Sequence, residues 1–314
     1  MKVIEINNEI NHIKAEEINL SGECMYWVIA NPEELKDCND IFKFHSLTIY
    51  ECFDSKQNAR LEFFDSYDFL VMNIVQYTGK TVISKELDIF IGKNYIVTVT
   101  KEELEILEKL EDELINFRQN VIFNSDRSIV KILYYILDKI IFNDYEIISA
   151  IENEADNIEI KILKNPDKRY LNDLIHLRKQ VHRLRGYISP LRYVGDNLVC
   201  NDNEIIGGEY QNYFLQINNR IEKLVSSLDS LVQYLVLVRE AFEAEISNKT
   251  NELMKVFTII TAIFLPLSLI TGIFGMDFNN IKMLKHDVAS QGTVVSMIVI
   301  SIMLFVIFKK KKWL

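Results

Sequence analysis

The chain has 314 residues and a formal net charge of −10, and it is long enough for a soluble domain and a membrane part. Residues 254–314 carry seven lysines and two aspartates, a net charge of +5, so residues 1–253 hold a net charge of −15. An acidic region argues against nucleic-acid binding, which needs a basic surface. It suits a body that concentrates cations, although solubility alone explains it equally well.

The cysteines and the first residues of the chain indicate in which cell compartment the acidic region lies. The four cysteines show no paired short spacing, which predicts neither a zinc site nor a disulfide framework (Cys24, Cys38, Cys52, Cys200). The chain opens on charged residues without an apolar core, so we expect no signal peptide. We therefore expect the region before the membrane part to stay in the reducing cytosol.

Residues 1–125 are predicted to form a small α/β domain, because short β-branched or aromatic runs alternate with Gly and Asn. The predicted strands are 25–29, 68–75, 87–91 and 95–99, and Gly92-Lys93-Asn94 predicts the turn of a hairpin from Asp88 to Val99. Thr100 with Glu103 predicts a capping box that opens a helix running to about Phe123. We find no Gly-rich phosphate loop and no nucleophile elbow, so we expect no enzyme.

Residues 126–253 are predicted to be wholly helical, as a hairpin followed by a stalk. One helix spans 128–163 and a second spans about 167–198, with a kink at Pro190. The first is acidic and the second is basic, and a short loop joins them, so we expect an antiparallel pair. The basic helix alone would also fit an RNA or lipid surface, but its acidic neighbour favours a solvated hairpin. A third helix begins near Tyr210, and its apolar seam comprises Tyr213, Ile217, Ile221, Leu224, Leu228, Leu231, Leu235, Val238 and Phe242.

Residues 254–314 are predicted to be the membrane domain, with spans at about 255–274 and 291–308. Residues 256–274 contain no charge, and this length can cross ~30 Å of hydrocarbon. A stripe of mostly small and polar residues recurs at alternating spacings of three and four (Asn251, Met254, Thr258, Thr261, Leu265, Ser268, Gly272). Such a stripe fits a helix that lines a water path or one that packs closely against copies of itself. Lysines flank one side of both spans, so both termini are expected in the cytosol of a multi-pass cell-membrane protein.

Two parts of the chain, about residues 247–278 and the terminal residues 309–314, resemble a known family. Asn251-Glu252-Leu253-Met254-Lys255, then residues 266–276 (PLSLITGIFGM) and the terminal residues 309–314 (KKKKWL), strongly resemble the CorA-type Mg2+/Co2+ transporters. That family follows its first membrane helix with a Gly-Met-Asn signature; here Gly275 and Met276 are followed by Asp277. The resemblance implies an α+β membrane protein: a cytosolic α/β domain, a helical stalk and hairpin, and two C-terminal transmembrane helices per subunit. It also implies a homopentameric funnel.

We interpret the stripe as the pore lining of such an oligomer, because one membrane hairpin encloses no interior. Asn251, Thr258, Thr261, Ser268 and the carbonyls near Gly272 and Gly275 would offer neutral oxygens to hydrated Mg2+, and Leu265 completes the lining. Met254 and Phe257 would form apolar constrictions that gate by dewetting; the relatives have Met and Leu at these positions.

The resemblance also implies a selectivity mouth at Gly275, Met276 and Asp277. A ring of Asp277 carboxylates would attract divalent ions and share a proton, whereas the alternative is a plain loop-capping Asp. Relatives place acidic residues between subunits as an Mg2+ sensor. At the matching stalk position this chain has Gln216, and Glu240 fills the acidic ring position nearer the membrane as a candidate regulatory metal ligand.

The predicted function is a passive divalent cation transporter or channel gated by its cytosolic domain. It would carry Mg2+, or Co2+, Ni2+ or Zn2+, with Mg2+ also as a possible regulator and without an organic cofactor. Its expected partners are copies of itself, the lipid bilayer and divalent cations, but not nucleic acid. The alternative is a cytosolic metal sensor or scaffold whose spans only anchor it in the membrane.

Overall fold

The computed structural model describes residues 1–6, 10–22, 24–54, 57–116, 128–274 and 287–311. The chain divides into two compact units. The first comprises Met1–Lys161 and Asp167–Arg239, and the second comprises Ile162–Pro166 and Glu240–Leu314.

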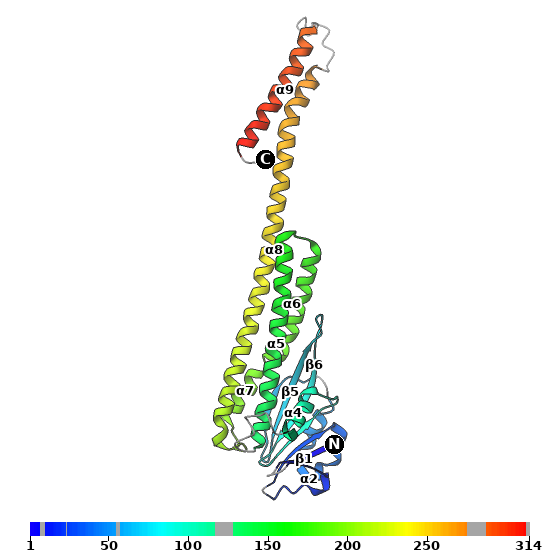
Figure 1. Ribbon diagram of the computed structural model, residues 1–314, viewed down its shortest axis with the longest axis vertical. Helices are drawn as coiled ribbons and strands as arrows, with labels where there is room; N and C mark the ends of the chain where they lie inside the picture. The colour runs from blue at the N-terminus through cyan, green and yellow to red at the C-terminus, as the bar shows by residue number, and fades with distance from the viewer. Residues whose placement is uncertain (7–9, 23, 55–56, 117–127, 275–286, 312–314) are drawn as a thin grey trace. The chain divides into compact units, whose positions relative to one another are not determined.

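A seven-stranded sheet forms the base of the first unit (Figure 1). Its strands, in sheet order, are β2 (Ile10–Ile13), β1 (Lys2–Ile6), β3 (Met25–Ala30), β7 (Tyr95–Val99), β6 (Val82–Ile91), β5 (Asp68–Tyr77) and β4 (Arg60–Phe63). β3 and β7 run parallel, and the other neighbouring pairs are antiparallel. All four predicted strands are present, whereas β1, β2 and β4 were not predicted.

The predicted hairpin of β6 and β7 is confirmed. Ile91 pairs with Ile96, and the N–H of Gly92 donates to the carbonyl of Tyr95 at 2.9 Å. A Cβ on Gly92 would lie 2.3 Å from the Tyr95 ring. The turn therefore needs glycine for space beside a packed aromatic ring.

Both faces of the sheet are covered, so its strands are apolar on both sides. One face carries an aromatic cluster in which Phe44 stacks on Phe90 with ring centroids 4.1 Å apart. Three short helices contribute to this face: α1 (Pro32–Asp37), α2 (Asn39–Phe42) and α3 (Ser46–Glu51). The residues that alternate with the cluster along the strands, including Trp27, Leu70 and Ile96, are also fully buried. A 3₁₀ turn, η1 (Ala15–Glu17), follows β2.

The helix predicted to open at Thr100 begins later, as α4 (Glu105–Asn116). Thr100 extends the sheet instead, because its N–H donates to the carbonyl of Ala30 at 3.1 Å. Its hydroxyl engages the backbone of Glu102 and caps no helix. The predicted capping box is therefore wrong, and the predicted end at Phe123 lies outside the described residues.

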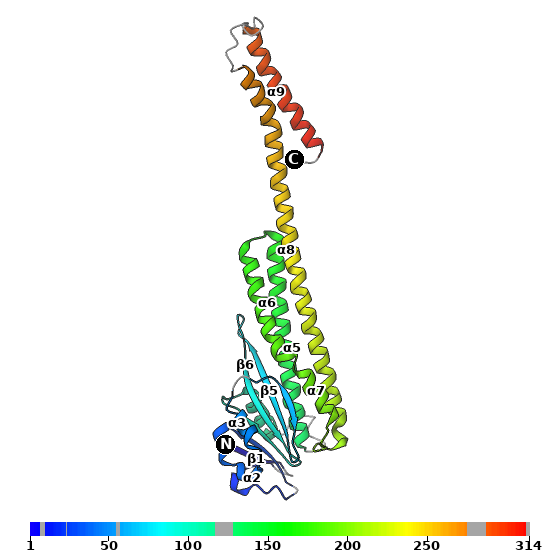
Figure 2. The same cartoon turned by 180° about the vertical axis from the view of Figure 1, so that it is seen from behind.

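The helical hairpin is confirmed, with a break in place of the predicted kink. α5 (Ile129–Lys164) and α6 (Lys168–Ile188) lie side by side in both views (Figures 1 and 2). The chain then breaks at Ser189-Pro190, and α7 (Leu191–Cys200) follows. The hairpin is tied to the sheet by the Asn143 amide, which donates to the Val75 carbonyl at 2.8 Å, and by the Gln180 amide oxygen, which accepts the Val82 N–H at 3.0 Å.

The opposite charges of the hairpin helices do not pair with each other among the described residues. Within the described part of the chain, the acids of α5 make no ion pair with the bases of α6 and α7. These helices use their charges on the third helix instead: Asp138 pairs with Arg220, Arg192 with Glu222 at 3.0 Å, and Arg185 with Asp229 at 3.7 Å.

The third helix, α8 (Gln211–Phe274), runs for 64 residues without interruption, a length of about 96 Å at ~1.5 Å per residue. A 3₁₀ turn, η2 (Gly208–Tyr210), precedes it. Every member of the predicted seam except Tyr213 is buried. The last helix, α9 (Asp287–Lys310), ends on lysines. Each of the two helices contains an 18-residue window that is apolar enough to cross a membrane.

Candidate ion pathway

The predicted pore-lining residues share one property: all of them are exposed in the single chain. The eight residues lie along α8 between positions 251 and 272 (Asn251, Met254, Phe257, Thr258, Thr261, Leu265, Ser268, Gly272). Their exposure is large where the side chain is apolar, at 59% for Met254, 64% for Phe257 and 66% for Leu265. Apolar exposure of this size indicates contact with lipid or with other copies of the chain.

The opposite side of α8 faces the second membrane helix. Ile259 is buried, and a set of neighbours at helical spacing is partly buried: Ala262, Ile263, Pro266, Leu267 and Ile270. α9 has a matching partly buried face at Thr293, Met297, Ile300, Ser301, Leu304 and Phe308, and the two helices lie side by side in both views (Figures 1 and 2). At about 100° per residue, the stripe and the α9-facing side lie on nearly opposite sides of α8. The stripe therefore does not pack against α9 and stays exposed in the single chain.

The hydroxyl groups of the two threonines in the stripe are oriented by the helix itself. Thr258 Oγ1 donates to the Met254 carbonyl at 2.7 Å, and Thr261 Oγ1 donates to the Phe257 carbonyl at 2.8 Å. A hydroxyl has one proton and two lone pairs. Because the proton is used within the helix, each oxygen presents only lone pairs outward. These oxygens can accept hydrogen bonds from water molecules around a cation.

The predicted selectivity mouth lies outside the described residues. Gly275, Met276 and Asp277 fall between Phe274, where α8 ends, and Asp287, where α9 begins. The roles of these three residues therefore stay predictions from the sequence.

The candidate regulatory ligand is Glu240, an exposed side chain on α8. Gln216, at the other family position, is also exposed and carries no charge. Among the described residues of one chain, no three His, Cys, Asp or Glu side chains come together as a metal site. One carboxylate is a poor Mg2+ site, since the ion takes six oxygen ligands, so Glu240 could hold Mg2+ only together with other groups or with hydration water.

Sequence reasoning missed several buried acids in the first unit. Burial raises the pKa of Asp68 to about 6 although Asn203 donates to it, and burial raises the pKa of Asp144 well above its ordinary value. Glu86 and Asp88 form a further pair on β6. The signal for Asp88 was present in the sequence, because a single acid stands between Leu87 and Ile89 in an apolar run.

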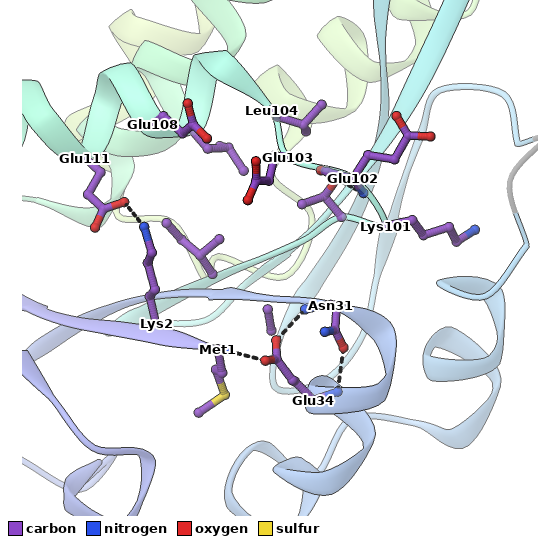
Figure 3. Close-up of a pocket in the computed structure, with 14 residues that line it drawn as sticks. Met1, Lys2, Asn31, Glu34, Lys101, Glu102, Glu103, Leu104, Glu108 and Glu111 are labelled. Atoms are coloured by element: carbon purple, nitrogen blue, oxygen red, sulfur yellow. Dashed lines mark hydrogen bonds and ion pairs between the residues drawn. The ribbon is translucent and has the colours of Figure 1, made fainter.

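A pocket of about 330 Å³ lies beside the first turn of α1 and the start of α4 (Figure 3). Its rim is rich in glutamate, but Lys2 already pairs with Glu111 at 2.8 Å, and Glu34 caps α1 through Asn31. The remaining acids, Glu102, Glu103 and Glu108, are exposed. The pocket therefore offers no converging set of free ligands.

The family comparison decides the identity of the chain. The model of the family described as "CorA-like Mg2+ transporter protein" matches residues 23–310. The chain belongs to this family. The recognition made from residues 251–276 and 309–314 is thereby confirmed.

Relatives of this CorA-like chain agree over nearly its whole length. It is 27% identical to the cobalt/magnesium transport protein CorA of Thermotoga maritima over 305 residues, which cover 95% of this chain and 83% of the relative. The complete structure of the CorA magnesium transporter from Methanocaldococcus jannaschii superposes with a TM-score of 0.84 at 20% identity, covering 100% of this chain and 98% of the other. Full-length CmaX superposes with a TM-score of 0.74 at 17% identity, covering 100% and 98%. The predicted fold class is confirmed for the single chain.

Proposed function

We propose that this CorA-like chain, a divalent cation transporter by its family, works as a channel that carries Mg2+ across the cell membrane. The observation that carries the proposal is the exposed stripe of α8, which lies opposite the side that packs on α9. A helix that only anchored the protein would gain nothing by presenting threonine oxygens away from its own partner helix, since polar groups facing lipid are costly.

The stripe can act only in an assembly, because two helices enclose no path. We propose a homopentamer in which the five stripes surround the axis, with both termini in the cytosol as the flanking lysines predict. Met254 and Phe257 then form two apolar rings at the cytosolic end of the span. Thr258, Thr261 and Ser268 line the path beyond these rings, and the mouth at Gly275, Met276 and Asp277 selects the ion.

Neutral oxygen acceptors suit Mg2+ in particular. The ion dehydrates reluctantly and is usually bound with several of its waters. Lone pairs that accept hydrogen bonds from these waters can hold the hydrated ion without stripping it. Co2+, Ni2+ and Zn2+ are the competing cargoes if Asp277 binds the dehydrated ion.

No energy source other than the membrane potential is needed. A charge of +2 that moves inward through 100 mV releases ~4.6 kcal/mol, at ~2.3 kcal/mol per elementary charge. We propose that the cytosolic domain gates this flow through α8, which runs continuously from the helical bundle into the apolar span.

Flux into liposomes tests the proposal. Purified full-length protein is reconstituted with an internal Mg2+-sensitive dye, and an inside-negative potential should produce a rise in internal Mg2+. The double variant Thr258→Val/Thr261→Val keeps the side-chain shape but removes both oxygens, and it should lower the flux strongly. Thr271→Val is the matched control, since Thr271 is exposed, hydrogen-bonds to its own helix and lies off the stripe.

The outcomes separate the two candidate functions. A potential-dependent flux that falls in the double variant but not in the control supports transport along the stripe. Absence of flux of every tested divalent ion, in correctly assembled protein, would contradict transport and leave the membrane-anchored sensor as the function. Equal losses in the double variant and the control would contradict the stripe as the path.

A further inference from the structure

A small cavity of about 90 Å³ lies in the first unit, and two acids on one strand line it. Glu86 and Asp88 are two residues apart on β6, so their side chains point to the same side of the sheet. Cys52, directly after α3, and Lys101, two residues beyond the end of β7, also line the cavity.

Both acids are buried and incompletely satisfied. Asp88 is 3% exposed, and the Glu86 side chain is 7% exposed. Within the described part of the chain, Asp88 Oδ1 and Glu86 Oε1 accept no hydrogen bond. Buried polar groups are normally hydrogen-bonded, so two open carboxylate oxygens at one cavity indicate a missing ligand.

The positive charge beside the cavity compensates only partly for the negative charges of ionised Glu86 and Asp88. Lys101 Nζ lies 3.8 Å from Glu86 Oε1, while its ammonium also donates to the carbonyl of Asp54. In Figure 3 the Lys101 side chain extends away from the glutamate-rich pocket, consistent with its role here. The Gln57 N–H donates to Glu86 Oε2 at 3.0 Å.

The other charged neighbours are engaged elsewhere. Arg60, on β4, pairs with Glu51 and Glu62, each at 2.6 Å. Lys85 pairs with Glu102 at 2.9 Å at the rim of the cavity. Asn73, across from Glu86 on β5, is neutral and donates to the Gln57 carbonyl at 3.0 Å. The Lys101 ammonium, 3.8 Å from Glu86, therefore faces two buried acids. The charge of Asp54 adds to the rise in the pKa of Glu86, and the charge of Arg60 opposes it.

We propose that the Glu86–Asp88 cavity is a proton-binding site, in which one bound proton holds the segment after α3 against β6. With the proton on Asp88, its carboxyl group is neutral beside the Cys52 thiol, and Glu86 keeps its hydrogen bond from Gln57 and its ion pair with Lys101. Without the proton, two negative charges occupy one small cavity and repel each other. The inference does not depend on the proposed transport function.

The titration of the pair agrees with this geometry. Burial, followed by the charge of Glu86, raises the pKa of Asp88 to about 7, while Cys52 and Lys101 oppose the rise. Burial also raises the pKa of Glu86. The folded chain thus binds a proton more tightly than the unfolded chain, so proton binding favours folding. Through Asp88, the free energy of unfolding falls as pH rises from about 4 to about 7, and the contribution of Asp88 is constant above pH 7.

Infrared spectroscopy of the full chain in lipid, with chelator present, tests the proposal. The band of protonated carboxyl groups is titrated between pH 5 and pH 9. The wild type minus Asp88→Asn difference should show one carboxyl that deprotonates near pH 7. Asp68 and Asp144 absorb in the same band in both proteins, so the difference isolates Asp88. Asp40→Asn, at an exposed acid of α2, is the control and should leave the band unchanged.

Glu86→Gln serves as a second variant. It removes the neighbouring charge and should shift the midpoint of the Asp88 band to lower pH. Hydrogen-exchange protection factors of residues 46–54, which are corrected for the intrinsic pH dependence of exchange, should be lower at pH 8 than at pH 6 in the wild type, and this difference should shrink in Asp88→Asn. An identical band in Asp88→Asn would overturn the proposal. An unchanged midpoint in Glu86→Gln would also overturn it, and this second test holds even if Asp88→Asn proves unstable.

Discussion

Thr261 donates its hydroxyl proton to the carbonyl oxygen of Phe257, 2.8 Å away, and Thr258 binds the carbonyl of Met254 in the same way at 2.7 Å. Each predicted constriction residue is therefore linked to a predicted lining residue one turn further along α8. The hydrogen bond fixes the rotamer of each threonine. The polar and apolar parts of the stripe are thus built on the same two turns of helix.

Removal of the apolar constrictions should raise the leak of divalent cations. Met254→Ala and Phe257→Ala each widen a ring that would otherwise exclude water, and an increase of about tenfold corresponds to ~1.4 kcal/mol taken from the barrier. The measurement is dye-detected flux into liposomes without activation. Ile260→Ala, at an exposed residue off the stripe, is the control and should leave the leak unchanged. Unchanged flux in both single variants and in their double variant would remove these residues from the gate.

The assembly should contain about five copies of the chain. A single α8–α9 pair encloses no path, so a conducting particle must be a ring. Native mass spectrometry of the detergent-solubilised protein measures the number of subunits. A monomer or simple dimer that still conducts ions would contradict the argument from the stripe.

Asp277→Asn should change the metal preference and keep the fold, because the two side chains are nearly isosteric. Neutralisation should weaken the attraction for dehydrated divalent ions, and it should flatten any pH dependence that arises from a proton shared within the ring. Competition of Co2+, Ni2+ and Zn2+ with Mg2+ uptake, measured across external pH, reports both effects. If affinity, metal order and pH profile all stay the same, Asp277 is a loop cap. If only the Asn variant takes up ions, the natural protein is a sensor.

Two glycines should respond in opposite ways to the same substitution. Gly92→Ala places a Cβ 2.3 Å from the ring of Tyr95, which packs against Phe42 with centroids 5.1 Å apart and cannot withdraw freely; we expect a loss of about 1–3 kcal/mol. Gly186 lies at an exposed position of α6, and a Cβ there would meet no atom within 4 Å. Gly186→Ala should therefore raise the free energy of unfolding by about 1 kcal/mol through helix propensity. Thermal unfolding of the two variants measures both. A stabilising Gly92→Ala would contradict the close packing at the turn.

Local patterns predicted the parts of the fold that local chemistry decides. The buried β-branched runs gave β3, β5, β6 and β7, and the spacing of Ile217, Leu224 and Leu231 predicted α8. β1, β2 and β4 are short, and β2 and β4 lie at the sheet edges, so their residues carry little signal of their own. The parallel pairing of β3 with β7 joins segments about 70 residues apart, which no local pattern encodes.

Errors arose where a distant partner outweighed a local signal. Thr100 has the features of a helix cap, but the carbonyl of Ala30 binds its N–H and keeps it in the sheet. The charges of α5 and α6 are complementary and predicted their antiparallel pairing, but the partner of Asp138 is Arg220 of α8, which no local pattern indicates. At the candidate pathway, helical periodicity was enough to place the stripe on one face. It did not predict which face packs on α9, since that depends on the tertiary contact.

The hydrogen bonds of the two threonines also bear on the sign of the charge that the span admits. Anions are held in proteins by groups that give protons, such as N–H and O–H. At Thr258 and Thr261 those protons are already donated to the helix, so in the proposed pore an anion would meet lone pairs and not donors at these two positions. The proposed path can therefore disfavour anions at the two threonines without a charged group there.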